Sequence, residues 1–470
     1  MEGRPLRNYD ESPTLRSTIN AMSDSSDVRF PQFFRVRQGF PRPRVTDLHA
    51  AVQAELERVG VREELRPGET VAITAGSRGI AGIPAILRAA VECLHNLGAK
   101  PFIVPAMGSH GGATAEGQRD LLARYGITEQ ACGCPIRSSM HTVVLGNAPQ
   151  RFPVHFDRHA FEADHVIVCG RIKLHTDFRG ELQSGLAKML LVGLGKHAGA
   201  QVYHRAFQDH SFDEIAESVA PMILATGKIA AGLAIIENAY EEVAQVEAVP
   251  IGQLLEREKE LLVVAQALMP RLPFEEADLL IVDEIGKNIS GTGMDTNIIG
   301  RKTSDHAGKS QEKPWIKRIF VRRLSSSTAG NATGIGLAEF TTESLVDEIN
   351  FEATRLNCVA SGHVTAGMLP LRYKSDADAI EAALATIGLV EPKHAKVLWI
   401  RNTLRLVEVE CSAAYRERAQ RDKTLTVISD LRPLPFDSAG NLPEEGSERM
   451  RSSAFPPAGQ HGLELEVEGP

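Results

Sequence analysis

The stretch DHVIVCGRIKLHTDFRGELQSGLAKML, residues 164–190, decides the fold. It begins with the short apolar run HVIVCG, which is typical of a buried strand. Polar and charged side chains follow at once, among them His175, Asp177, Arg179 and Lys188. A core strand that ends in reactive groups indicates a parallel α/β sheet with a ligand site beyond the strand ends.

The chain on either side of this stretch repeats the alternation of strand and helix. Strands are predicted at 69–76, 100–107 and 162–170, and helices at 48–60, 82–98, 115–126 and from the capping box Ser211–Glu214 onward. A second series has segments at 276–286, 317–324, 331–340, 342–357, 376–388 and 395–402, with helices at 342–357 and 376–388. Strands joined by helices imply parallel βαβ units. We therefore predict an α/β protein with two domains of mostly parallel, Rossmann-like βαβ architecture and the active site in the cleft between them.

Length and local composition predict where the domains lie. A chain of 470 residues exceeds one typical core and favours two domains. Residues 1–45 are polar and rich in Pro, Ser and Arg, which predicts a flexible lead-in, and 431–470 have the character of a disordered tail. Between them we predict an N-terminal α/β domain at 46–272, carrying the cofactor and catalytic residues, and a C-terminal α/β domain at 273–430.

Composition excludes several classes of protein. The formal net charge of -8 disfavours nucleic acid or an anionic membrane as the main partner. No window approaches the roughly 18 apolar residues of a membrane span, and the N-terminus lacks the apolar core of a secretory signal. Six scattered cysteines predict reduced thiols in a cytoplasmic protein, and the C-x-C of Cys132 and Cys134 is not expected to bind a metal.

The ends of the three first-domain strands predict a site. Ser77 and Arg78 follow the first strand, His110 follows the second within GSHGG, and His175 follows the third. Gly111 and its neighbours let backbone approach a ligand and present N–H groups to a phosphate. An arginine fork binds carboxylate or phosphate, and imidazoles titrate near neutrality. Alone, each residue is most simply a solvated side chain, but together they predict a small-anion site with an acid/base pair.

Lys188 has two interpretations. In its small and apolar surroundings it can lose its proton and become a nucleophile, or it can extend its amine to solvent. His204 follows 16 positions later, with His197 and His210 as nearby competitors for any role.

At these residues the chain resembles the nickel-dependent lactate racemase family, whose members carry a nickel-pincer nucleotide. The resemblance covers roughly residues 50–420 and is strongest in the first domain. It implies that Lys188 binds the cofactor, nickel pyridinium-3,5-bisthiocarboxylic acid mononucleotide, covalently, and that His204 is the metal ligand. His110 and His175 would be the catalytic acid and base for the two enantiomers, and Arg78 would bind the substrate carboxylate. Ser77 and Gly111 are further candidates for cofactor binding.

The implied activity is that of an isomerase, a 2-hydroxy acid racemase or epimerase acting by reversible hydride transfer. Its partners would be a small 2-hydroxy acid and the cofactor maturation enzymes, without nucleic acid or membrane, and homo-oligomer formation is left open. In the second domain, Lys287 and Trp399 are the candidates for bordering the substrate.

The chain departs from the family between His175 and Lys188, where the segment TDFRGELQSGLA is longer and more charged, and at Ala75, where the family has an acidic residue. Asp177, Arg179 and Glu181 would then either line a pocket for a larger or more polar acid than lactate or form a solvated loop. Two alternatives remain: a family member that performs other chemistry with the pincer or with a bare metal, and a non-catalytic protein that binds a nucleotide or organic acid.

Overall fold

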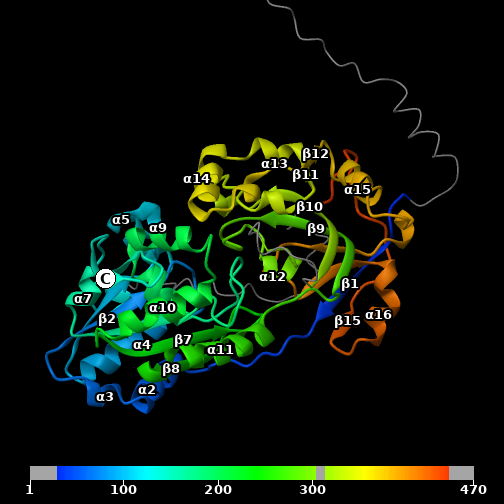
Figure 1. Ribbon diagram of the computed structural model, residues 1–470. Helices are drawn as coiled ribbons and strands as arrows, with labels where there is room; N and C mark the ends of the chain where they lie inside the picture. Colours follow the sequence, from blue (N-terminus) through cyan, green and yellow to red (C-terminus); the bar gives the residue numbers. More distant parts are fainter. Residues whose placement is uncertain (1–28, 303–312, 444–470) are drawn as a thin grey trace, which may run out of the picture.

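The computed structural model describes residues 29–302 and 313–443, which form two α/β units, each built on its own sheet (Figure 1). Five strands form the first sheet, in the order β3 (Lys100–Pro105), β2 (Thr70–Ala75), β6 (His165–Arg171), β7 (Ile229–Glu237) and β8 (Val243–Pro250). All neighbours are parallel except β7 and β8. A separate hairpin pairs β4 (Thr142–Asn147) with β5 (Pro153–Asp157). The strands predicted at 69–76, 100–107 and 162–170 are therefore confirmed.

Strand β6 explains why this sheet is buried on both faces. Val166 and Val168 point into one apolar cluster, whereas Ile167 and Cys169 point into another on the opposite face. Such a continuous apolar run is typical of a central parallel strand covered by helices on both sides. The helices of this unit are α2 (Leu48–Arg58), α3 (Val61–Glu64), α4 (Ile83–Asn96), α5 (Ala115–Arg124), α6 (Glu129–Cys132), α7 (Arg158–Glu162), α8 (Leu186–Lys188), α9 (Lys196–Ala206), α10 (Phe212–Leu224) and α11 (Leu254–Leu268). Short 3-10 segments are η1 (Gly111–Ala113) and η3 (Ile251–Gln253), and η2 (Met189–Gly193) is π-helical.

The second sheet has eight strands, in the order β12 (Leu371–Tyr373), β11 (Phe340–Thr342), β10 (Trp315–Leu324), β9 (Glu276–Ile285), β13 (Val397–Ile400), β14 (Glu408–Ser412), β1 (Phe33–Gln38) and β15 (Leu425–Val427). The strands from β12 to β13 are parallel, and β14, β1 and β15 add antiparallel pairs. Its helices are α12 (Thr296–Ile299), α13 (Glu343–Asp347), α14 (Phe351–Ser361), α15 (Asp376–Leu384) and α16 (Arg416–Arg421). The 3-10 segments are η4 (Ser326–Thr328), η5 (Ile335–Leu337), η6 (Val364–Gly367), η7 (Pro392–His394) and η8 (Ala413–Tyr415). The predicted mostly parallel α/β fold with two Rossmann-like domains is confirmed.

Both predicted terminal segments differ from the structure where it describes them. Within the lead-in predicted at 1–45, β1 pairs with β14 and β15, so the second sheet contains the first strand that the structure describes. Within the tail predicted at 431–470, the backbone of Arg432 forms two hydrogen bonds with the backbone of Phe33. Leu434 and Leu442 are buried in an apolar cluster of the second domain. Both segments are short and flanked by polar residues, which hid their apolar side chains from a compositional argument. The remainder, 1–28 and 444–470, lies outside the described residues.

The helix predicted at 342–357 is two helices, α13 and α14. The side chain of Asn350 accepts a hydrogen bond from the N–H of Ala353 and begins α14, because asparagine is a favoured N-cap. The predicted boundary near 272 falls in the link between α11 and β9 and stays a prediction. In the part of the chain that the structure describes, no helix has the length and apolar character needed to cross a membrane.

Candidate active site

The candidate residues of the first domain leave from three neighbouring strands. Ser77 and Arg78 follow β2, His110 follows β3, and His175 follows β6. Because β3, β2 and β6 are adjacent and parallel, these segments leave the same edge of the sheet. Arg78 and Lys188 lower the pKa of His110 electrostatically, and Lys188 has the same effect on His175, in both cases after the larger effect of desolvation.

His110 is accessible to solvent. Desolvation by the neighbouring protein, followed by repulsion from the Arg78 cation, lowers its pKa to about 3. Its Nδ1 lies 2.8 Å from the carbonyl oxygen of Met107 in the same loop. Gln118, which is fully buried, donates from Nε2 to the carbonyl oxygens of Gly108 and His110 at 3.0 and 3.2 Å. The loop that carries His110 is therefore fixed at its backbone.

Gly111 and Ser77, the candidates for cofactor binding, have backbone roles in this structure. A Cβ on Gly111, whose φ is +66°, would lie 2.5 Å from the carbonyl carbon of Gly117, so glycine is required for close approach to α5. The carbonyl oxygen of Ser77 accepts a hydrogen bond from the Tyr125 hydroxyl at 3.1 Å. Their roles toward a nucleotide stay predictions.

His175 is held by its own loop. Its Nδ1 accepts hydrogen bonds from the backbone N–H groups of Asp177 and Phe178 at 3.0 and 3.2 Å. Its ring stacks on Phe178 with a centroid distance of 3.9 Å. Burial, followed by the nearby Lys188 cation, lowers its pKa well below 6.5, so the ring is neutral at physiological pH.

The amine of Lys188 is in an unusual environment. Within residues 29–302 and 313–443, its Nζ has no hydrogen-bond partner and no carboxylate at ion-pair distance, and the Phe178 ring lies 5.4 Å away. Burial, followed by repulsion from Arg78, lowers its pKa to about 7. A large fraction of this amine is therefore unprotonated and nucleophilic at neutral pH.

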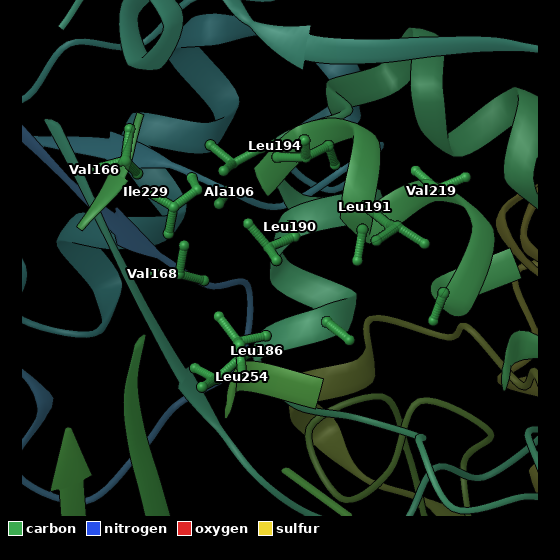
Figure 2. Packing of buried hydrophobic residues seen from close by; sticks show 14 of the residues in the cluster. Ala106, Val166, Val168, Leu186, Leu190, Leu191, Leu194, Val219, Ile229 and Leu254 are labelled. Atoms are coloured by element: carbon green, nitrogen blue, oxygen red, sulfur yellow. The ribbon is translucent and has the colours of Figure 1, made fainter. Parts of the chain in front are cut away.

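Apolar packing fixes the segment that carries Lys188. Leu186, Leu190 and Leu191 belong to one apolar cluster with Val166 and Val168 of β6 (Figure 2). The π-helical turn η2 follows directly, and π-helical turns are frequent at functional sites. The lysine thus extends from an otherwise buried segment.

Glu258 of α11 caps this segment. Its buried carboxylate accepts the N–H of Ala187 through Oε2 at 2.7 Å, at the start of α8. A Cβ on Gly185 would lie only 2.3 Å from Glu258 Oε1, so residue 185 must be glycine for the carboxylate to reach the helix. Burial raises the pKa of Glu258 to about 7.

We expect Glu258 to make stability depend on pH. Its pKa rises from 4.5 to about 7 on folding, so the folded state binds the extra proton between these values and stability falls as pH rises. Relative to Glu258→Gln, the wild-type free energy of unfolding should drop by about 3 kcal/mol from pH 4.5 to 8, measured by urea denaturation. Glutamine keeps an oxygen acceptor for the N–H of Ala187. If the free energy of unfolding changes with pH by the same amount in both proteins, this expectation is wrong.

His204 lies on α9, which begins after η2. Burial lowers its pKa to about 4, with further contributions from Lys188 and His363. A neutral imidazole near Lys188 is chemically suited to ligate a metal. Among the described residues, no group of three His, Cys, Asp or Glu side chains is arranged to hold a metal ion by itself. All six cysteines, including Cys132 and Cys134, are buried free thiols.

From the second domain, Lys287 reaches the same region. Its Nζ donates to the carbonyl oxygen of Gly291 at 2.6 Å, and burial followed by Arg78 lowers its pKa to about 8. A Cβ on Gly291 would lie 3.4 Å from Arg78 Nη2, so both cations border this glycine. Three cations of this region have no carboxylate oxygen within 4.0 Å of their nitrogens in the part of the chain that the structure describes: Arg78, Lys188 and Lys287. Their positive charge is therefore left to attract an anionic ligand.

Trp399, the other second-domain candidate, does not border this region. It is buried in β13 within the core of the second domain, and its Nε1 donates to Asp283 Oδ1 at 2.7 Å. The interpretation of Trp399 as a substrate contact is therefore wrong. Of the charged loop residues, Asp177 acts electrostatically on Lys188 and Lys287, whereas Glu181 is mostly exposed.

Second-domain residues that the sequence did not single out hold the His175 loop. Asn297 Nδ2 and Lys302 Nζ donate to the carbonyl oxygen of His175 at 3.2 and 2.7 Å, and Thr296 Oγ1 donates to that of Thr176 at 2.5 Å. Asp295 forms an ion pair with Lys173 at 3.6 Å. Nothing in the composition around α12 distinguishes these polar side chains from a solvated turn.

Comparison with known proteins identifies the first domain. A family model described as the lactate racemase N-terminal domain matches residues 43–215, the segment that contains Arg78, His110, His175, Lys188 and His204. Residues 43–215 thus carry a lactate racemase N-terminal domain, in agreement with the resemblance of the first domain. A comparison with curated proteins found no match.

Two solved structures are similar to the chain. One is the lactate racemase apoprotein from Thermoanaerobacterium thermosaccharolyticum, with 12% sequence identity, coverage of 80% of this chain and 99% of that chain, and a TM-score of 0.49. The other is a Thermotoga maritima protein, with 12% identity, coverage of 78% and 99%, and a TM-score of 0.49.

Proposed function

We propose that the protein is a nickel-pincer nucleotide-dependent racemase or epimerase of a 2-hydroxy acid. The family match supports a racemase-type function in general. The observation that carries the finer proposal is the amine of Lys188, which has a pKa of about 7 and no partner among the described residues. A structural lysine would be expected to have a carboxylate or carbonyl partner, whereas a covalent anchor needs a free amine.

The donor set fits the nickel-pincer nucleotide. Lys188 would hold the nucleotide through its amine, and neutral His204 would provide an imidazole ligand to the nickel. When bound, this group would supply a reversible hydride acceptor for the substrate Cα. Arg78 and Lys287 would bind the substrate carboxylate, since neither has a carboxylate of its own in the described part of the chain. His110 and His175 would act on the substrate hydroxyl.

We propose that the substrate is a larger or more polar 2-hydroxy acid than lactate. Asp177 acts on Lys188, His204 and Lys287, and Lys173 and Lys302 border His175. These charged groups near the candidate acid/base pair favour a substrate with polar groups beyond its 2-hydroxy acid end.

The test is intact-protein mass spectrometry with nickel analysis, on protein coexpressed with the maturation enzymes. The expected result is one covalent adduct mapped to Lys188 with about one nickel per chain, together with racemisation in a panel of 2-hydroxy acids. An unmodified chain, under conditions that load a known lactate racemase, would overturn the proposal. Metal without nucleotide would then favour the bare-metal alternative, and ligand binding without turnover would favour a non-catalytic protein.

A further inference from the structure

The ring nitrogens of the two candidate histidines have partners of opposite kind. His110 Nδ1 lies 2.8 Å from the carbonyl oxygen of Met107, which can only accept a hydrogen bond. His110 Nδ1 therefore carries a hydrogen. Since the ring is neutral, its Nε2 keeps a lone pair and can accept a proton.

The ring of His175 has the other tautomer. Its Nδ1 faces the backbone N–H groups of Asp177 and Phe178, at 3.0 and 3.2 Å, and these groups can only donate. Nδ1 must therefore provide the lone pair, and the hydrogen of the neutral ring lies on Nε2. A proton on Nδ1 would be directed at two N–H groups and would leave both without an acceptor.

The orientation of the His175 ring is fixed on several sides. It stacks on Phe178 with an interplanar angle of 13°, and Phe178 stacks on Phe212 with a centroid distance of 4.7 Å. The backbone N–H of His175 donates to Gln183 Oε1 at 2.8 Å, and its carbonyl oxygen accepts from Asn297 and Lys302 of the second domain. A ring flip would replace Nδ1 by a C–H group opposite the two amides, which disfavours it.

We propose that His175 acts as a neutral hydrogen-bond donor, through Nε2–H, to the oxygen on C2 of the substrate, and that His110 alone exchanges the hydroxyl proton. This assignment rests on the proposed function. His110 Nε2 takes the proton as the 2-hydroxyl becomes a 2-keto oxygen and gives the same proton back on return. His175 transfers no proton, and its hydrogen bond stabilises negative charge on the oxygen. The cations Lys188, Lys302 and Lys173 further disfavour an imidazolium at His175.

The tautomers can be measured without cofactor. Long-range nitrogen–proton correlation spectra of the apo-protein, labelled with nitrogen-15 in histidine, distinguish protonated from unprotonated ring nitrogens. His110→Gln and His175→Gln spectra assign the two rings by loss of their signals. At neutral pH we expect hydrogen on Nδ1 of His110 and on Nε2 of His175. Hydrogen on Nδ1 of His175, or rapid exchange between its two tautomers, would overturn the proposal.

Turnover gives a second test on cofactor-loaded protein. His175→Gln keeps an N–H donor and should retain activity within about 10-fold, whereas His175→Leu removes it and should lower kcat by about 10²–10³-fold. His110→Gln should lower kcat by about 10²–10⁴-fold. Equal losses for the two glutamine variants would overturn the assignment. If the loaded wild-type protein turns over no 2-hydroxy acid, the proposed function fails, and the spectra still decide the tautomers.

Discussion

Replacing Lys188 with arginine is expected to abolish covalent attachment of the cofactor. Arginine keeps the positive charge, but its guanidinium stays protonated and is not an acylation nucleophile at neutral pH. The wild-type amine, by contrast, has a pKa of about 7 because it is buried near Arg78. We expect the mass of Lys188→Arg to be that of the bare polypeptide, and turnover to fall to background.

Lys287→Arg is the matched control for this experiment. Lys287 is the other lysine near Arg78, its pKa is lowered to about 8, and it bonds to the carbonyl oxygen of Gly291. This variant should keep the adduct and lose affinity for the substrate carboxylate, which raises KM. An adduct that survives in Lys188→Arg and disappears in Lys287→Arg would transfer the anchor to Lys287.

Lys196→Met is expected to cause the largest loss of stability. Lys196 is fully buried, with its Nζ 2.7 Å from the carbonyl oxygen of Pro105, 2.8 Å from Gln118 Oε1 and 3.5 Å from Asp157 Oδ2. Without the lysine, the buried Asp157 carboxylate has lost its cation and Gln118 its donor. Removing one partner of a buried pair costs about 3–5 kcal/mol, measurable by urea denaturation.

The double variant Lys196→Met with Asp157→Asn separates charge from packing. Asparagine keeps the side-chain oxygen that caps α7 through Ala160, but it removes the unpaired charge. We expect the double variant to be more stable than Lys196→Met alone at pH 8. If both variants unfold at the same urea concentration, the cost comes from lost packing and hydrogen bonds, not from the stranded carboxylate.

The first domain was predictable because its determinants are local. Strands β2, β3 and β6 are each a short apolar run, and the residue types just after each run indicated one site edge that includes Arg78, His110 and His175. Parallel βαβ units place these positions together without any knowledge of side-chain packing.

The features that could not be predicted from the sequence depend on contacts between distant parts of the chain. The pairing of Arg35 in β1 with Glu410 in β14 joins residues 375 positions apart, and no local pattern encodes it. In the same way, Asn297 and Lys302 touch the His175 carbonyl oxygen only because the domains associate. The tautomer of His175 also could not be inferred, since it depends on the path of the backbone through Asp177 and Phe178.

The place of β1 between β14 and β15 has a consequence for biosynthesis. The first described strand leaves the ribosome long before its partners, whereas the five-stranded sheet is complete once β8 has emerged. The N-terminal domain can thus fold during translation, while β1 waits for residue 427 before the second sheet closes. The backbone of Phe33 is hydrogen-bonded to that of Arg432, so β1 lies close to the last described residues. In a circularly permuted chain that begins near 46 and carries β1 after 443, each domain would therefore consist of one uninterrupted segment.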